Sequence, residues 1–179
     1  MHTPQLLAFL LLTIIWPTLS DPFGDLQVTP TSSTIQEITD YQFSLTLTGD
    51  GMSTYNIPVG SSLVIHFPEE YPLLAAQTLT CAIIQWPTPY SPITCSLAYR
   101  TLTLTNPFTS PLTIGLSQTY TFKWLVKNIQ NPQYATTTSY FSGDITSNGT
   151  PLFSSFTPAS YLGLTITPGT LSTSPYIQP

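Results

Sequence analysis

Apolar and polar residues alternate with a period of two along much of the chain. Residues 41–48 place Tyr, Phe and Leu at every second position, with Gln, Ser and Thr between them. Residues 120–126 repeat this pattern with Tyr, Phe, Trp and Val. Successive side chains of a strand point to opposite faces, so both segments predict strands that bury one face. Residues 120–126 are the clearest candidate for a central strand.

Longer apolar runs and weaker alternation predict the remaining strands. Residues 61–67 form a largely apolar run that ends at Pro68, which predicts a strand buried on both faces. Further strands are predicted over residues 78–84, 97–104 with a break near Arg100, 134–144, 153–156 and 161–167. Turn signals fall about every 8–12 residues. Eight or nine short strands predict an all-β fold, an antiparallel two-sheet sandwich of Greek-key, jelly-roll or immunoglobulin-like type.

The composition supports one folded domain with few charges. The chain has 179 residues, of which 41% are hydrophobic and 6% are charged, whereas soluble domains average about 25% charged residues. Surface helices need more Glu, Lys and Arg than this to hydrate their outer faces, so a helical bundle is excluded. The hydrophobic content excludes a disordered chain. The net charge of −5 opposes binding to nucleic acid, which needs a basic surface to displace counterions.

The first 20 residues predict an export signal. An apolar run over residues 6–16 is followed by Pro17 and by the small residues Thr18 and Ser20, a pattern typical of a secretory signal peptide cleaved after Ser20. A signal anchor is the alternative, but the run has about 11 residues where a membrane span needs about 20. Residues 171–179 are polar and lack a lipid-anchor signal. We therefore expect an extracellular protein whose mature chain has no membrane span.

Two cysteines fit an oxidising compartment. Cys81 and Cys95 are the two cysteines of the chain, and such a pair in an exported domain predicts one disulfide. Closing a loop of about 15 residues stabilises a fold by roughly 3 kcal/mol in the chain-entropy model. Two separate buried thiols are the alternative. His66 is the only histidine outside the signal segment, so we expect no metal site.

One glycosylation sequon occurs, at Asn148-Gly149-Thr150. It lies in a turn-like stretch, so we predict that Asn148 is exposed and carries a glycan if the source glycosylates asparagine. The same Asn-Gly pair is also the preferred sequence of a two-residue hairpin turn. The two interpretations are compatible.

Candidate catalytic residues are few. Glu69 and Glu70 lie close to His66, but adjacent strand residues point to opposite faces, so the two carboxylates do not form a facing acid and base pair. We interpret His66 as a structural histidine. The acidic residues that could gather at one end of a sandwich to bind calcium are Asp25, Asp40, Asp50 and Asp144. No calcium-loop spacing supports that site. Since the sequence shows neither a catalytic constellation nor a metal-ligand spacing, we expect no enzyme activity, cofactor or metal.

Aromatic residues make up 12% of the chain and include 10 Tyr and 3 Trp. Exposed on a sandwich, such rings could stack on sugars and make a lectin-like module. The same rings are equally suited to packing in a core or an interface. We assign Trp124 to the core, because it lies in the predicted central strand.

The two ends of the domain share a short pattern. Residues 26–30 read Leu-Gln-Val-Thr-Pro, and residues 164–168 read Leu-Thr-Ile-Thr-Pro. We predict that one terminal segment adds as a strand to a sheet edge of the next subunit. The predicted assembly contacts are Leu26, Val28, Leu162, Leu164 and Ile166. The predicted division is a signal peptide (1–20), an N-terminal extended segment (21–30), the sandwich (31–161) and a C-terminal strand and tail (162–179).

Four short motifs, with the two cysteines among them, carry a resemblance to a known type of module. They are YQFSLT at residues 41–46, LVIHFPEEY at 63–71, NIQNP at 128–132 and YFSGD at 140–144. Over about residues 26–168 the chain resembles a repeating extracellular β-sandwich module of large surface proteins of ciliated protists. It departs from them in having one copy and no cysteine-rich repeats. The resemblance implies a structural role at a surface, and the like ends resemble subunits of strand-exchanged filaments.

Three classes of function are consistent with these features. The first is a secreted structural subunit that forms a head-to-tail homopolymer, with residues 162–179 donated to the neighbour or, in the opposite polarity, residues 21–30. The second is a monomeric adhesin or carbohydrate-binding module that recognises surface glycans. The third is a secreted hydrolase, for which the sequence offers no acid and base constellation. We expect the first, with the second as its main alternative.

Overall fold

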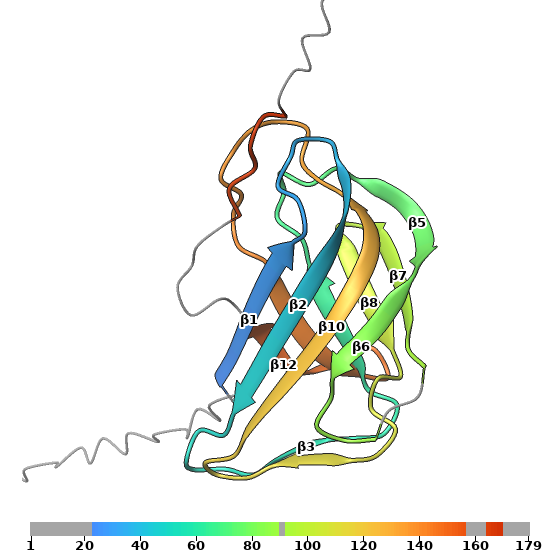
Figure 1. Cartoon of the computed structure of the whole chain (residues 1–179). Coiled ribbons are helices and arrows are strands. Elements are labelled where there is room, and N and C mark those ends of the chain that lie inside the picture. Colours follow the sequence, from blue (N-terminus) through green and yellow to red (C-terminus); the bar gives the residue numbers. More distant parts are fainter. Residues whose placement is uncertain (1–22, 90–91, 157–163, 170–179) are drawn as a thin grey trace, which may run out of the picture.

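The computed structural model describes residues 23–89, 92–156 and 164–169, whose β-strands form twisted sheets packed against each other (Figure 1). Within these ranges the chain forms twelve strands, and each strand runs antiparallel to the strands with which it pairs. This part of the chain contains no helix long and apolar enough to cross a membrane. The predicted all-β antiparallel fold is confirmed. The predicted signal peptide and Leu162 lie outside the described residues.

Four strands form the first sheet. Their order is β1 (Phe23–Pro30), β2 (Ile38–Thr48), β10 (Thr119–Gln130) and β6 (Cys81–Gln85). The two central strands, β2 and β10, contain the segments with the clearest alternation, and their register sets Trp124 opposite Phe43. β1 pairs with β2 along its whole length. Residues 23–30 of the predicted N-terminal segment are therefore an edge strand of the sandwich itself.

Six strands form the second sheet, and two short strands form a separate ribbon. The sheet order is β12 (Thr150–Phe156), β11 (Ser142–Ser147), β4 (Ser62–His66), β8 (Thr101–Thr105), β7 (Thr94–Tyr99) and β5 (Leu74–Leu79). The ribbon pairs β3 (Tyr55–Ile57) with β9 (Leu112–Ile114). The chain crosses repeatedly from sheet to sheet. For example, β5 and β7 belong to the six-stranded sheet, whereas β6, which lies between them in sequence, belongs to the four-stranded sheet.

The prediction of one strand over residues 78–84 is wrong. β5 ends at Leu79 in the six-stranded sheet, and β6 begins at Cys81 in the four-stranded sheet, with only Thr80 between them. The chain turns a corner of the sandwich at this point (Figure 1). The apolar run does not reveal the break, because a local pattern does not record which sheet a residue joins.

Two other expectations need correction. In β4, Leu63 and Ile65 are buried, whereas Val64 and His66 on the opposite face are partly exposed, so this strand is not buried on both faces. An antiparallel sandwich covers only the inner face of each sheet, which explains the difference. Residues 97–104 are two strands, β7 and β8, whose paired ends Ala98 and Thr101 enclose a two-residue turn at the predicted break near Arg100.

Aromatic side chains fill the space between the sheets. Trp124 is fully buried, as predicted, and its ring stacks on Phe43 with a centroid separation of 5.2 Å and an interplanar angle of 7°. Phe67 packs edge-on against Tyr71 and Phe141, with centroid separations of 5.1 and 5.0 Å. Each such pair contributes about 0.5–1.5 kcal/mol beyond the burial of its area.

The predicted disulfide is confirmed, and it joins the two sheets. Cys81 at the start of β6 is bonded to Cys95 in β7, with a Cα–Cα distance of 6.1 Å. Cys95 is fully buried and pairs with Leu79, the last residue of β5. The bond therefore fastens the corner where the chain passes from one sheet to the other.

We expect a Cys81→Ser, Cys95→Ser double variant to fold but to lose about 3 kcal/mol of unfolding free energy, because the closed loop no longer restricts the unfolded chain. Urea unfolding followed by tryptophan fluorescence measures this loss. Reduction of the unaltered protein should reproduce the loss and have no effect on the variant. Equal stability of the two proteins would contradict the prediction.

Candidate binding groove at one end of the sandwich

Loops from both sheets gather at one end of the sandwich, which we call the groove pole. They are residues 31–37, 67–73 and 131–141, the turn at Tyr99 and Arg100, and the terminal segment 164–169. This end is uppermost in Figure 1, and the ribbon of β3 and β9 lies at the opposite pole. Loops at the end of a rigid sandwich are common positions for binding residues.

A buried hydrogen-bond network holds three of these loops together. The hydroxyls of Tyr41 and Tyr71 are hydrogen-bonded at 2.9 Å, and the Tyr41 hydroxyl also donates to Oδ1 of Asn131. Nδ2 of Asn131 donates to the carbonyl oxygens of Ser32 and Thr34 at 3.0 and 2.7 Å. Asn131 has no exposed surface, and its amide is satisfied within the network. Because a broken bond here would leave a buried polar group unpaired, the network fixes the loops relative to the core.

Burial keeps both tyrosines of this network protonated. Burial raises the pKa of Tyr41 from 10.0 to about 12. The hydrogen bond with Tyr71 lowers this pKa, but by less than burial raises it. Burial also raises the pKa of Tyr71, and the nearby Tyr41 and Glu70 raise it further. A charged phenolate would be poorly solvated at this position. Both hydroxyls therefore remain hydrogen-bond donors at neutral pH.

A hollow of about 570 Å³ opens between these loops. Small-molecule sites are typically about 300–1,000 Å³, so the hollow is large enough for a small organic ligand. Its walls are residues 69–73, Arg100, residues 132–134 and Thr136. We call this hollow the groove.

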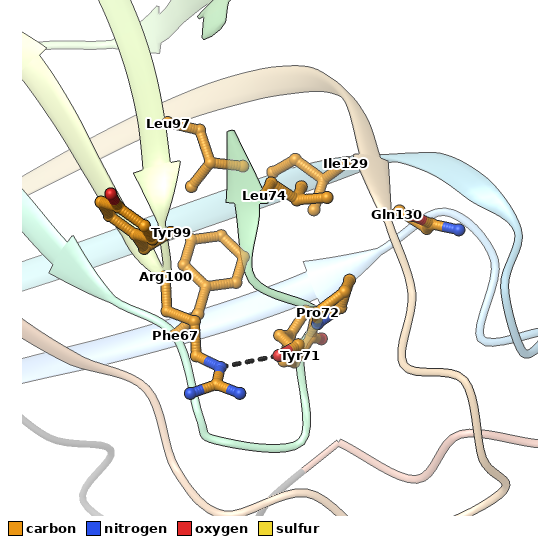
Figure 2. Close-up of a pocket in the computed structure, with 9 residues that line it drawn as sticks. All are labelled: Phe67, Tyr71, Pro72, Leu74, Leu97, Tyr99, Arg100, Ile129 and Gln130. Atoms are coloured by element: carbon orange, nitrogen blue, oxygen red, sulfur yellow. Dashed lines mark hydrogen bonds between the residues drawn. The ribbon is translucent and has the colours of Figure 1, made fainter. Parts of the chain in front are cut away.

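Arg100 and an apolar layer form the floor of the groove. Nε of Arg100 donates to the carbonyl oxygen of Tyr71 at 2.7 Å (Figure 2), and the Arg100 carbonyl accepts the backbone N–H of Phe67 at 2.8 Å. A second, smaller space lies on the other side of this bond, and Figure 2 shows its lining residues, among them Leu74, Leu97 and Ile129. Its volume of about 10 Å³ is too small for an organic ligand.

Glu70 joins two walls of the groove. Its Oε1 atom accepts hydrogen bonds from both the backbone N–H and the hydroxyl of Ser139, each at 2.9 Å. Partial burial acts to raise the pKa of Glu70. The backbone N–H groups of Glu70 and Ser139, the Ser139 hydroxyl and the positive charge of Arg100 outweigh burial, so this pKa lies below its ordinary value. Glu70 is therefore an ionised, anchored carboxylate at neutral pH.

Large side chains project from the rim of the groove and beside it. In the walls, Tyr134 is 76% exposed and Leu73 is 64% exposed. Tyr99, next to Arg100, is 69% exposed and has a positive φ of 57° in the turn between β7 and β8. Non-glycine residues rarely adopt this conformation, which the tight turn imposes here. The rings of Tyr134 and Tyr99 are not part of the core, so both are available to a ligand.

The sequence-predicted catalytic candidates do not converge. Nε2 of His66 is 2.8 Å from Oδ2 of Asp144 on the neighbouring strand β11, which agrees with a structural role for His66. Glu69 and Glu70 follow Pro68 and line the groove instead. No sequence pattern joins these two glutamates with Arg100, because the turn that supplies Arg100 lies about 30 residues away along the chain.

The four aspartates of the calcium alternative lie apart. Asp50 accepts hydrogen bonds from the N–H groups of Met52 and Ser53 in its own turn, both at 2.8 Å, and from the Tyr55 hydroxyl at 2.7 Å. The other three have separate partners: Asp25 accepts from Gln27, Asp40 from the backbone N–H of Asn128, and Asp144 is hydrogen-bonded to His66 on the neighbouring strand. Within residues 23–89, 92–156 and 164–169, no group of three or more His, Cys, Asp or Glu side chains could hold a metal ion.

Asn148 lies at the pole opposite the groove. Asn148 and Gly149 have positive φ values of 50° and 78° and connect the paired residues Ser147 and Thr150 of β11 and β12. This two-residue turn confirms the hairpin interpretation. The Asn148 side chain is exposed. Its glycosylation stays a prediction.

The predicted assembly residues within the described ranges contact their own sandwich. Leu26 is fully buried and Ile166 is 2% exposed, while Val28 and Leu164 are partly buried against the core. Residues 164–167 lie between two segments of the same chain. The backbone bonds are Thr138 N–H to Leu164 O at 2.9 Å, Ile166 N–H to Thr136 O at 2.8 Å and Thr167 N–H to Ser33 O at 2.8 Å. Donation of this segment to a neighbour would first have to break these contacts.

No family model and no curated protein matches the chain. Among solved structures, the chain is similar to a family GH18 chitinase from Chromobacterium violaceum, with 11% sequence identity and a TM-score of 0.33. The alignment covers 82% of this chain and 21% of the chitinase. A TM-score this low carries no argument about fold or function.

We expect the unfolding free energy to fall as the pH rises from 10 toward 12, because the folded protein keeps the Tyr41 proton that the unfolded chain releases. A shift of this size corresponds to roughly 3 kcal/mol. Tyr41→Phe should be less stable at pH 8 by about 1–2 kcal/mol and should lose part of the pH dependence. Urea unfolding at several pH values measures both effects.

Tyr134→Phe is the matched control, because it changes an exposed tyrosine at the same pole. Its stability should follow the unaltered protein across the pH range. An unchanged pH dependence in Tyr41→Phe would contradict the role assigned to the buried network.

Proposed function

We propose that this chain is an exported β-sandwich module that binds carbohydrate in the groove. The observation that carries the proposal is an exposed aromatic ring, Tyr134, beside fixed polar groups in a hollow of ligand size. Aromatic faces pack well against the C–H faces of sugar rings, since both are weakly hydrated. Carboxylate and amide groups accept and donate the hydrogen bonds that sugar hydroxyls require.

The preformed geometry of the groove supports recognition. Tyr41 links the wall residue Tyr71 to Asn131, and Glu70 is bonded to Ser139, so little loop ordering would be needed when a ligand binds. The state of Glu70 favours binding over hydrolysis. A glycosidase needs a carboxylic acid that keeps its proton near neutral pH, whereas the hydrogen bonds from Ser139 and the charge of Arg100 hold Glu70 ionised.

An extracellular location belongs to the same proposal. The predicted signal peptide supports it, and the Cys81–Cys95 disulfide is compatible with an oxidising compartment. Exposed sugar-binding surfaces with few charges suit contact with neighbouring cells or matrix, which is the adhesin function considered above.

Retardation in gels that contain soluble glucan, mannan or galactan tests carbohydrate binding. We expect at least one polysaccharide to slow the mature protein, and Tyr134→Ala to weaken the association about tenfold, or roughly 1.4 kcal/mol. Met52→Ala is the control, because Met52 is 83% exposed at the opposite pole. Unchanged migration in all gels would overturn the proposal, as would equal retardation of Tyr134→Ala.

A second candidate is the head-to-tail homopolymer. The pole opposite the groove also carries exposed apolar side chains, those of Met52, Val59 and Leu116, and contact between unlike poles can propagate without closing. β1 begins at that opposite pole, where Phe23 pairs with Thr48, and Gly169 lies beside Thr34 at the groove pole. This form of assembly needs no strand exchange.

Sedimentation velocity over a wide concentration range tests assembly. We expect the mean mass to rise with concentration, and a Met52→Asp, Leu116→Asp double variant to remain monomeric because charge would be buried at the contact. Deletion of residues 170–179 tests donation of the last part of the predicted C-terminal segment 162–179: pole contact predicts normal assembly, and donation that uses these residues predicts its loss. A monomer at every concentration would contradict both.

A further inference from the structure

We propose that the groove selects neutral sugar chains over acidic ones, an inference that rests on the proposed carbohydrate binding. The charged groups of the groove are Glu69, Glu70 and Arg100. Two carboxylates and one guanidinium leave one net negative charge, and the whole chain also carries −5. The local and overall charge therefore have the same sign.

The single cation of the groove is held through one of its nitrogens and lies close to a carboxylate. Arg100 is the only arginine of the chain, and its Nε atom is bonded to the Tyr71 carbonyl oxygen in the floor. Its charge also acts on Glu70, whose ionised form it stabilises. A side-on bidentate grip on a sugar carboxylate or sulfate uses Nε together with a terminal nitrogen of the guanidinium group. Because its Nε is bonded to the Tyr71 carbonyl oxygen, Arg100 does not offer this side-on pair.

Glu69 is the exposed carboxylate of the wall. A sugar hydroxyl can donate a hydrogen bond to Glu69, whereas a sugar carboxylate brings a like charge close to it. Like charges within a few ångströms repel one another, and the repulsion is stronger in a partly enclosed site than in free water. Glu69 therefore favours a neutral ligand and opposes an acidic one.

Arg100 also distinguishes a neutral sugar from a basic peptide. Exposed tyrosines beside carboxylates can attract a lysine or arginine side chain through its charge. Here such a side chain would enter a groove whose floor already holds a guanidinium group. One fixed charge of each sign in the lining, with an excess carboxylate at the wall, suits a ligand with many hydroxyls and no charge.

Calorimetry with matched oligosaccharides tests the selection. The pairs are glucose and glucuronic acid, mannose and mannuronic acid, and galactose and galacturonic acid oligomers of equal length. For the sugar that retards the protein in gels, we expect the neutral member to bind about tenfold more tightly than the acidic member at low salt. High salt should narrow the difference, because it screens the repulsion from Glu69.

Glu69→Gln should bring the two affinities within about threefold, because it removes the like charge while its amide oxygen still accepts a hydrogen bond. Glu37→Gln is the matched control: Glu37 is exposed at the same pole but outside the groove walls, and its substitution should preserve the discrimination. Equal or tighter binding of the acidic member overturns the inference and leaves carbohydrate binding standing. Tyr134-dependent binding of a lysine-rich peptide, with no sugar bound, overturns both.

Discussion

The hydrogen bond between Tyr41 and Asn131 is the contact on which the groove pole depends. Tyr41 projects from the central strand β2 into the aromatic core, and Asn131 follows the end of the other central strand, β10. A buried amide and hydroxyl must find partners, and here the available partners are backbone and side-chain groups of neighbouring loops. The need to satisfy two polar side chains therefore determines where the loops of the groove lie.

A second constraint acts at the corner of the sandwich. The chain leaves one sheet at Leu79 and enters the other at Cys81, and the disulfide to Cys95 fixes this passage covalently. With the corner and the groove pole both held, the two sheets cannot slide past each other without breaking the aromatic packing around Phe43 and Trp124. The rigid body that results is a suitable support for a binding surface.

The same features bear on both proposed functions. Hydroxyl-bearing residues cover much of the outer sheet faces, for example at Thr46 and Thr121, whose hydroxyls are 3.4 Å apart. Several large exposed apolar side chains lie at the poles, among them Tyr134 and Met52, whereas Ile84 is exposed on the edge strand β6. Since few charges are present to hydrate these patches, a ligand or a second subunit gains most by covering a pole. Carbohydrate binding is favoured because the groove also has fixed polar groups.

The sequence by itself determined the all-β class, the inward face of β2 and β10, the burial of Trp124, the disulfide and the Asn148 turn. These features depend on alternation, turn chemistry or pairing of two cysteines, which are local or limited in choice. Only the tertiary structure decided that residues 78–84 divide between two sheets, that Ile166 returns to its own core, and that Arg100 lines one hollow with residues 69–73, 132–134 and Thr136. Such features depend on long-range pairing, because a strand's pattern specifies which face is buried but not which strand or loop becomes its neighbour.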